Sequence, residues 1–514
     1  MTRTTSTIKN IGYALIGQFL GTLTVFISRI FFLKVLSTDY LGLNGLFTNI
    51  LTVLSFAELG FGTAITFSLY NPLVNDDKEK IKSLMYLYKI IYRYVTVIIF
   101  VIGSILTPFL KYLIADMPDI SDIYVIYLLY VINTSISYVC SYKKTLVIAD
   151  QNRYIATFYR YFCYIFLNII QTIVLLIFRN YIIYMIIQIF FTFLENYLIS
   201  KKADKMYPYL LDKNVKKLGD NEKKDLFKNT KAMLMHKIGG ILVNSTDNII
   251  LSKYVGLSSV GIYSNYLIIK QALISITGQI FNATSAGIGN LCADNESNEK
   301  KVQVFYNLNF ASFVIYSITS IGLVNVLVPF ITLWIGEEYI FSTNINLMFI
   351  LIYYITGMRN PVLTYREAMG LFYKDRYKAI IEAIVNLLFS IVLAKKIGTI
   401  GVLLGTLISS IGVSVWVEIH ILFKYGFKLK PKHYIERYIV YFILTILMSI
   451  ITNVICNKIA VQNLFFKVII NGVISVVTSI GCICILYRKT DEFKYFKELF
   501  KMILQTKQRK STIK

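Results

Sequence analysis

Four ionisable side chains lie within strongly apolar stretches of this 514-residue chain, where a charge is costly. Arg29 and Lys270 are cationic, and Glu58 and Asp247 are acidic. A charged side chain at the centre of a membrane helix costs about 2.5–3.5 kcal/mol on insertion scales, so it normally faces a cavity or a partner. Two cations in one cavity would bind an anion, and the carboxylates could take up a proton or Na⁺.

Each of the four residues also has a purely structural explanation. Arg29 lies close to one end of its apolar stretch, so its long side chain could reach the membrane surface. Lys270 and Asp247 could form a structural ion pair, and Glu58 could likewise be a structural partner. The residue types alone leave these alternatives open.

Residues that loosen helices accompany these charges. Gly60 and Gly62 lie within AELGFGTAI at 57–65, the segment that holds Glu58, and Pro108 and Pro329 lie inside two other apolar stretches. Glycine lets helices approach closely or bend in a membrane, and proline removes a backbone hydrogen bond. Hydroxyl and amide side chains are frequent around Asp247 and beyond Lys270. An aromatic, hydroxyl-rich cavity with a few cations suits a sugar that carries a phosphate.

The composition predicts the elements that position these residues. Hydrophobic residues make up 56% of the chain, charged residues only 16%, and mean hydropathy is +0.60. A membrane helix needs about 20 apolar residues. We expect an all-α polytopic membrane protein with fourteen transmembrane helices, whose spans are 11–33, 41–69, 84–113, 121–142, 155–178, 181–199, 232–255, 260–288, 304–331, 340–357, 377–397, 399–423, 436–456 and 464–487.

Positive charge alternates between the two sides of these spans. With a cytoplasmic N-terminus, the inner segments hold 43 of the 53 Lys and Arg residues and the outer segments hold 8. Cytoplasmic loops carry such an excess, so both termini are predicted to be cytoplasmic. The net charge of +24 is therefore explained by orientation, and we expect no nucleic-acid partner.

The two halves of the chain resemble each other. ILTPFLKYLI at 105–114 matches VLVPFITLWI at 326–335, Gly42 matches Gly261, and Arg153 matches Arg376, in the same order and at a nearly constant offset. A repeat of six helices is even, so the two copies should be parallel, related by an axis along the membrane normal. Such lobes leave a cleft between them, which rocking could open to alternate sides.

This repeat predicts five segments. They are an N-lobe at 1–200, a basic cytoplasmic linker at 201–231, a C-lobe at 232–423, a helical hairpin at 424–487 and a basic tail at 488–514. Apolar residues in the tail recur at helical spacing, which favours an amphipathic helix on anionic membrane lipids over a solvated tail.

No pattern typical of catalysis or metal binding occurs in the sequence. None of the six cysteines forms a CxxC pair, and DxD, HExxH, GxSxG and P-loop motifs are absent. The longest interruption of the apolar pattern is the short stretch 201–231, which excludes a large soluble catalytic domain. We predict no catalytic residues, no metal site and no cofactor, with coupling to H⁺ or Na⁺ left open.

Three segments resemble Wzx-type polysaccharide flippases of the multidrug/oligosaccharidyl-lipid/polysaccharide (MOP) exporter superfamily. They are SFAELGFGTAITFSLYNPL at 55–73, STDNIILSKYVGLSSVGIYSNYLII at 245–269 and GLFYKDRYKAIIEAIVNLLFSIVLAKKIGTIGVLLGT at 370–406. The resemblance implies a MATE-like fold in the bacterial cytoplasmic membrane. It also implies alternating-access flipping of an undecaprenyl-pyrophosphate-linked oligosaccharide for capsule, exopolysaccharide or cell-wall glycan assembly. Polysaccharide polymerase and glycosyltransferases are the implied partners.

The resemblance also assigns roles to residues. Relatives that flip the peptidoglycan precursor use cations in the first and eighth spans of a central cavity, and Arg29 and Lys270 look like their counterparts. Lysine in place of arginine would loosen bidentate phosphate binding. Asp247 is the nearest match to the acidic ion-coupling residues of drug exporters in this superfamily.

Three other functions fit parts of the pattern. An ion-coupled multidrug exporter of the same superfamily is the first alternative, although cavity cations would repel cationic drugs. A membrane glycan polymerase or glycosyltransferase would need a larger loop or domain than the chain offers. An assembly scaffold would show no transport.

Overall fold

The computed structural model describes most of the chain as helices, and the described residues form no strand. It describes residues 3–58, 61–115, 117–120, 122–139, 141–212, 214–216, 218–219, 222, 224, 245–293, 297–371, 374, 377–459 and 461–498. The chain divides into two compact units. The first holds residues 1–267 and 379–402, and the second holds residues 268–378 and 403–514.

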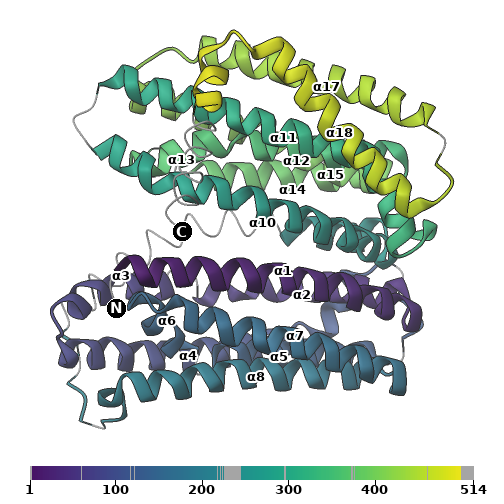
Figure 1. Ribbon diagram of the computed structural model, residues 1–514. Coiled ribbons are helices and arrows are strands. Elements are labelled where there is room, and N and C mark those ends of the chain that lie inside the picture. Colours follow the sequence, from purple (N-terminus) through teal and green to yellow (C-terminus); the bar gives the residue numbers. More distant parts are fainter. Residues whose placement is uncertain are drawn as a thin grey trace, which may run out of the picture. The chain divides into compact units, whose positions relative to one another are not determined.

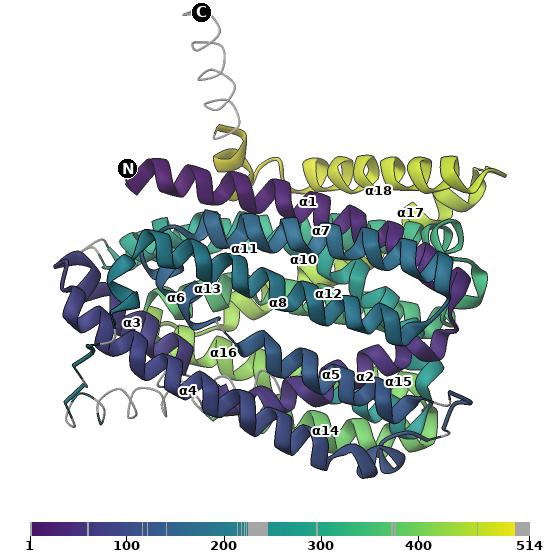
Figure 2. The same ribbon diagram turned by 90° about the horizontal axis from the view of Figure 1, so that it is seen from below.

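Long helices lying side by side build the first unit (Figures 1 and 2). α7 packs between α1 and α8, and α5 packs between α8 and α4. The helices of this unit are α1 (Arg3–Val35), α2 (Thr38–Leu54), α3 (Phe61–Val74), α4 (Lys78–Ile105), α5 (Ile123–Tyr138), α6 (Tyr142–Ala149), α7 (Arg153–Phe178) and α8 (Tyr181–Met206), with 3₁₀ turns η1 (Ser55–Glu58), η2 (Thr107–Tyr112) and η3 (Pro208–Leu211).

Short polar turns set the ends of these helices. Arg179 ends α7 in the left-handed conformation, and the side chain of Asn180 then accepts hydrogen bonds from the backbone N–H groups of Ile182 and Ile183 at the start of α8. Asp77 caps α4 in the same way by accepting from Lys80 N at 2.9 Å. Such caps satisfy N–H groups that have no partner within the helix. The turn at Arg179 and Asn180 fixes the hairpin that brings α7 against α8.

α10 (Leu257–Ala293) begins in the first unit at a close crossing with α2. A Cβ atom built on Gly42 would overlap the backbone of Leu257, and one built on Gly261 would overlap the carbonyl oxygen of Thr38. Only glycine allows two backbones to approach this closely at both points. α2 and α10 therefore touch backbone to backbone at their first turns.

α11 (Asn298–Trp334) is the centre of the second unit and packs against α12, α17 and α18. Phe313 of α11 stacks on Tyr441 of α17 with ring centroids 4.1 Å apart. Beyond α11, the remaining elements are η4 (Glu337–Tyr339), α12 (Thr343–Met358), α13 (Asn360–Ala368), α14 (Lys378–Ile397), α15 (Thr399–Ser409), the π-helices η6 (Ser410–Val415) and η7 (Leu422–Phe427), α16 (Trp416–Ile421), α17 (Lys432–Lys458) and α18 (Leu464–Tyr487); most of α14 belongs to the first unit.

The start of the C-terminal tail contacts the second unit. Residues 491–498 are helical. Glu492 forms an ion pair with Arg437 of α17, and the ring centroid of Phe496 lies 6.2 Å from that of Phe310 in α11. At least one apolar residue of the predicted amphipathic helix therefore contacts protein. The tail residues beyond 498, including the rest of that pattern, lie outside the described residues.

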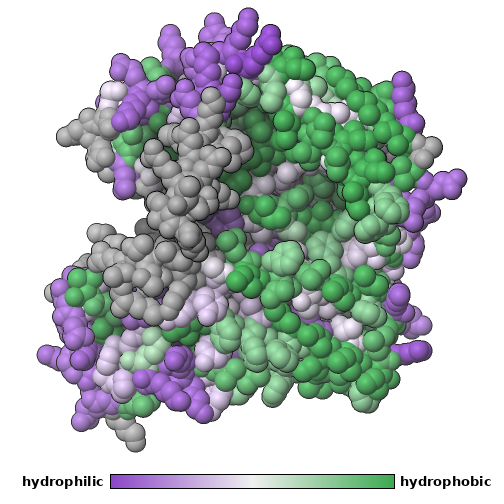
Figure 3. All heavy atoms as spheres, viewed as in Figure 1, coloured by the Kyte–Doolittle hydropathy of each residue, from purple (hydrophilic) through white to green (hydrophobic). Residues whose placement is uncertain are grey.

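The chain is an all-α polytopic membrane protein, as predicted. Among the described residues nine helical segments are long and apolar enough to cross a membrane, or ten if the bent pair α5–α6 counts as one. Apolar side chains cover much of the face seen in Figure 3, and hydrophilic ones gather mainly toward the helix ends. The finer count of fourteen spans stays a prediction.

The predicted span 41–69 differs from the helices observed. The stretch 41–69 was expected to be continuous, but α2 ends at Leu54, η1 covers Ser55–Glu58 and α3 begins at Phe61. Hydropathy averages over a window and does not detect such a break. The polar contacts of Glu58 described below hold the η1 turn in place.

Candidate functional site

Arg29 of α1 lies in a polar cavity of about 170 Å³ within the first unit. Its Nη1 donates a hydrogen bond to Ser264 Oγ of α10 at 3.3 Å. Polar side chains of α1, α2, α7 and α8 line this cavity, namely Ser28, Asn44, Tyr164, Asn168, Gln171, Thr172, Tyr184 and Gln188. Among the described residues that line it, Arg29 alone carries a charge.

The guanidinium of Arg29 keeps much of its hydrogen-bonding capacity. A guanidinium has five N–H donors. Within the described part of the chain, the bond to Ser264 is the one side-chain hydrogen bond of Arg29, and no carboxylate pairs with it. A half-buried cation without a counter-ion is costly in a membrane, because such charges normally pair or face water. The cavity can therefore accept an anion.

A second polar cavity of about 250 Å³ adjoins the first and shares Asn44, Tyr184 and Gln188 with it. Its other polar residues come from α2, η1 and α5, and they are Thr48, Thr52, Ser55, Tyr130, Asn133 and Thr134. Together the two cavities, called the N-unit cavity below, offer hydroxyl and amide groups over an extended surface. Such groups suit a ligand with many hydroxyls.

Tyrosines surround Arg29. Tyr130, Tyr164, Tyr181 and Tyr184 all lie within electrostatic reach of its guanidinium. The hydroxyls of Tyr130 and Tyr181 are hydrogen-bonded at 2.7 Å, and the rings of Tyr181 and Tyr184 stack with centroids 5.4 Å apart. The sequence analysis expected an aromatic lining without naming its residues. These tyrosines come from three helices, so no spacing in the sequence could have identified them as one group.

Glu58 lies in a hydrogen-bonded network at the η1 turn. Tyr92 OH of α4 donates to Glu58 Oε1 at 2.8 Å, and Tyr88 OH donates to Tyr92 OH at 2.6 Å. A Cβ atom on Gly62 would lie 2.8 Å from Glu58 Oε1, so glycine makes room for the carboxylate. Glu58 thus has a structural partner, and its coupling role stays a prediction.

Asp247 and Lys270 fall in different units. Asp247 is buried in the helical segment 245–254 of the first unit, and Lys270 is half-buried on α10 in the second. The ion pair, the shared cavity and the binding roles considered for them stay predictions.

The residues chosen for helix flexibility lie in three settings. Gly62 is in the first turn of α3, and Gly60 lies outside the described residues. Pro108 follows the end of α4, in the first turn of η2. Pro329 lies inside α11, which continues past it to Trp334. Two of these positions therefore accompany helix ends, and one does not interrupt its helix.

A buried charge cluster in the second unit was not predicted from the sequence. Glu418 of α16 is 1% exposed and accepts two hydrogen bonds from Arg359, at 2.9 and 2.7 Å. Lys378 also donates to it, and Arg366 approaches to 3.9 Å. Three cations thus surround one carboxylate between two π-helices. Of the described residues, no group of three or more His, Cys, Asp or Glu could hold a metal ion.

Neither a protein-family model nor a curated protein matches the sequence. Solved structures do match. The lipid II flippase MurJ in an inward closed conformation aligns with a TM-score of 0.65 at 15% identity, over 92% of this chain and 98% of MurJ. An inward-facing multidrug resistance MATE family transporter of the MOP superfamily aligns with a TM-score of 0.62 at 14% identity, over 80% and 98%.

A third match is a mutant of the Vibrio cholerae MATE transporter VcmN. It aligns with a TM-score of 0.55 at 13% identity, over 83% of this chain and 99% of that one. The chain therefore shares the fold of these transporters, which confirms the expected MATE-like, all-α architecture. Flippases and drug exporters share it, so the fold does not choose between them.

Proposed function

We propose that this protein is a flippase that moves an undecaprenyl-pyrophosphate-linked oligosaccharide from the inner to the outer leaflet of the bacterial cytoplasmic membrane. The observation that carries the proposal is Arg29, a cation without a carboxylate partner among the described residues, in a cavity lined by tyrosines and amides. We propose that the flippase acts in capsule, exopolysaccharide or cell-wall glycan assembly, with polysaccharide polymerase and glycosyltransferases as partners.

The chemistry of such a substrate matches the N-unit cavity in two parts. Pyrophosphate oxygens accept charge-assisted hydrogen bonds from a guanidinium, which are about twice as strong as neutral ones. Sugar hydroxyls exchange hydrogen bonds with residues such as Asn44 and Gln188, and sugar rings pack on Tyr184. The polyprenyl chain needs no protein cavity because lipid already solvates it.

Helix positions support the six-helix repeat that alternating access requires. α5 and α12 have the same length, so a single shift in numbering aligns both of their ends. Nearly the same shift takes the start of α2 to the start of α10 and Gly42 to Gly261. We propose fourteen spans in two parallel lobes plus a hairpin, with Lys270 as the second anion-binding residue and H⁺ or Na⁺ coupling through Glu58 or Asp247.

Drug export by an ion-coupled mechanism is the second candidate. Its support is the similarity to MATE transporters, whose TM-score of 0.62 is close to the 0.65 of MurJ. Arg29 argues against cationic drugs as cargo, because a cation repels them from the same cavity. An anionic, sugar-bearing cargo would be attracted by Arg29 and not repelled.

Transport by the purified protein in proteoliposomes tests the proposal. We expect Arg29→Ala to lower the flipping rate of a fluorescent undecaprenyl-pyrophosphate oligosaccharide about tenfold or more, because a hydrogen bond to a charged group contributes about 1.5–3 kcal/mol. Arg29→Lys should keep part of the activity. Lys34→Ala is the matched control, since Lys34 is an exposed cation of the same helix and does not line the cavity.

Three results would contradict the proposal. One is full flipping by Arg29→Ala, and another is an equal loss in Lys34→Ala. The third is a wild-type protein that moves a cationic dye but not the lipid-linked sugar, which would favour drug export.

A further inference from the structure

A second group of cations lies along one face of α4, away from the residues assigned above to substrate. Lys82, Tyr86, Lys89 and Arg93 recur at alternating steps of four and three positions, so they share one face of this helix. Lys82 is 7% exposed, Lys89 is half-buried and Arg93 is exposed. The face therefore runs from a buried cation to an open one.

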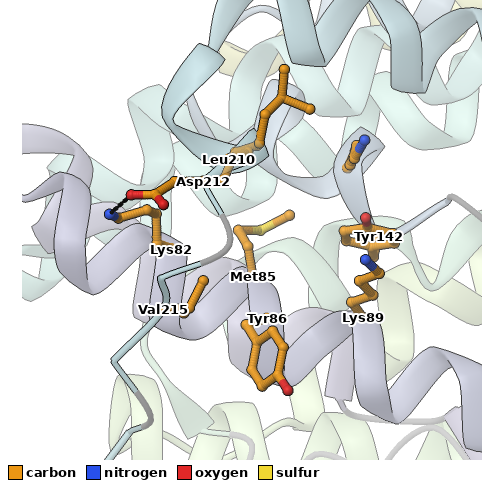
Figure 4. Close-up of a pocket in the computed structure, with 10 residues that line it drawn as sticks. Lys82, Met85, Tyr86, Lys89, Tyr142, Leu210, Asp212 and Val215 are labelled. Carbon is orange, nitrogen blue, oxygen red and sulfur yellow. Dashed lines mark hydrogen bonds and ion pairs between the residues drawn. The ribbon is translucent and has the colours of Figure 1, made fainter.

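Two adjoining hollows follow this face, and together we call them the α4 groove. The first, of about 390 Å³, is drawn in Figure 4, and the second is about 600 Å³. Lys89 and Tyr142 line both, so the hollows meet at these residues. The rest of the lining is Lys82, Met85, Tyr86, Lys143, Leu210, Leu211, Asp212 and Val215 in the first hollow, and Tyr92, Arg93, Thr96, Val97, Tyr138 and Val139 in the second.

Acidic partners neutralise only one part of the groove. Lys82 Nζ pairs with Asp212 Oδ2 at 3.0 Å and also with Glu79, and Lys143 Nζ pairs with Asp204 at 2.6 Å. A hydrogen bond from the backbone N–H of Asn214, together with Lys82, holds the pKa of the Asp212 carboxyl below its usual value. Asp212 is therefore ionised at neutral pH, and its end of the groove is balanced in charge.

The other part of the groove keeps its positive charge. Within the described part of the chain, neither Lys89 nor Arg93 forms an ion pair, although both line the second hollow. They are one helical turn apart, about 6 Å, which is close enough for one anion to reach both. The groove therefore carries two adjacent cations that can bind the same phosphate.

The surroundings of these two cations change from polar to apolar along the helix. Asp212 lines the first hollow, whereas Val97 and Val139 line the second and are 58% and 37% exposed. Apolar side chains of α4 beyond the groove are also exposed, namely Ile98, Val101, Ile102 and Ile105. A phosphate at Lys89 and Arg93 would thus lie at the interface between water and the hydrocarbon core of the membrane. That is the place of a lipid headgroup rather than of a dissolved phosphate.

We propose that the α4 groove binds the phosphate of an anionic phospholipid, with Lys89 and Arg93 bonding to the phosphate oxygens and an acyl chain lying over Val97 and Val139. Basic pockets at the membrane surface bind acidic headgroups in this way. The site is separate from Arg29 and holds whether the protein moves lipid-linked sugars or drugs.

Binding of a fluorescent phosphatidylglycerol to the full-length protein in neutral detergent tests the site. The competitors are unlabelled phosphatidylglycerol, phosphatidylcholine and inorganic pyrophosphate. We expect phosphatidylglycerol alone to compete. The double variant Lys89→Gln, Arg93→Gln should weaken binding about tenfold or more, from the loss of two cations near an anionic headgroup.

Two further double variants serve as matched controls. Lys428→Gln with Lys430→Gln removes the same charge from exposed positions before α17 and should bind normally. Lys89→Arg with Arg93→Lys keeps the charge and should bind nearly as well as wild type. If the neutral groove variant does not fold, Val97→Trp fills the apolar end of the groove and should weaken binding in its place.

Two outcomes would overturn the proposal. One is unchanged phosphatidylglycerol binding in a folded groove variant. The other is competition by pyrophosphate that equals that of phosphatidylglycerol and depends on the same two residues, which would make the ligand a soluble phosphate.

Discussion

Glu58 combines a defined hydrogen-bond partner with a proposed role in ion coupling. Its Oε1 accepts from Tyr92, and Gly62 leaves room beside it. A neutral amide at this position could accept the same hydrogen bond from Tyr92. A single substitution can therefore separate the contribution of Glu58 to stability from the ion-coupling role proposed for it.

We expect Glu58→Gln to abolish the dependence of transport on a proton or Na⁺ gradient while the melting temperature changes little, because the amide oxygen still accepts from Tyr92. Transport with and without each gradient, in the same proteoliposomes, measures this. Tyr92→Phe is the control, since it removes the hydrogen bond but keeps the carboxylate and should keep the gradient dependence. Unchanged dependence in Glu58→Gln would leave Glu58 as a structural acceptor alone.

At the residue scale, the sequence indicated which charged residue stands out, but it did not indicate which side chains surround it. Arg29 stands out because an arginine in an apolar stretch needs an explanation. Its tyrosines come from α5, α7 and α8, and its partner Ser264 lies far along the chain, on α10. Contacts of that kind depend on which helix faces pack together, which hydropathy does not encode.

Among the elements, the buried cluster around Glu418 joins residues of the second unit that come from three helical segments. Arg359 stands at the junction of α12 and α13, Lys378 begins α14, and Glu418 belongs to α16. π-helical turns such as those on either side of α16 often mark places where a helix deforms. The ion pairs hold this deformed region against its neighbours.

We expect Glu418→Gln to lower the free energy of unfolding by about 3–5 kcal/mol, because removing one partner of a buried ion pair leaves uncompensated charge. Thermal unfolding in detergent measures the loss. Glu436→Gln is the matched control: Glu436 lies 4.0 Å from Lys432 on the surface of α17, and an exposed pair contributes about 1 kcal/mol or less. Equal effects of the two substitutions would contradict a stabilising role for the cluster.

Hydropathy predicted uninterrupted elements well and broken ones badly. The predicted span 464–487 has the same limits as α18, and 155–178 differs from α7 only at its first residues. The predicted span 399–423 is not one uniform helix, because it changes from α15 to the π-helix η6, then to α16 and to the π-helix η7. Apolar length determines where a helix crosses the membrane, whereas local hydrogen bonding determines where it changes form.

For the whole molecule, the distribution of positive charge predicts which ends of the helices face the cytoplasm. The turn at Arg179, between α7 and α8, is expected outside, and the turn at Asp76, before α4, is expected inside. Both side chains are exposed, so a cysteine at either position would be open to a reagent.

We expect Arg179→Cys to react with a membrane-impermeant maleimide in intact cells, and Asp76→Cys to react only after the cells are permeabilised. The labelling is done in a chain whose six native cysteines are replaced. A missed or surplus span between the two positions would give both cysteines the same accessibility. Labelling of Asp76→Cys alone in intact cells would reverse the whole topology.

The crossing of α2 and α10 bears on where this architecture came from. Gly42 meets Leu257 and Gly261 meets Thr38, and the shift in numbering from Thr38 to Leu257 is the same as that from Gly42 to Gly261. Each contact therefore repeats the other. One surface patch that meets its own copy is the arrangement found at the twofold axis of a homodimer. We propose that a half-length ancestor paired through this patch before gene duplication and fusion joined the copies, and that these two glycines are what remains of that interface.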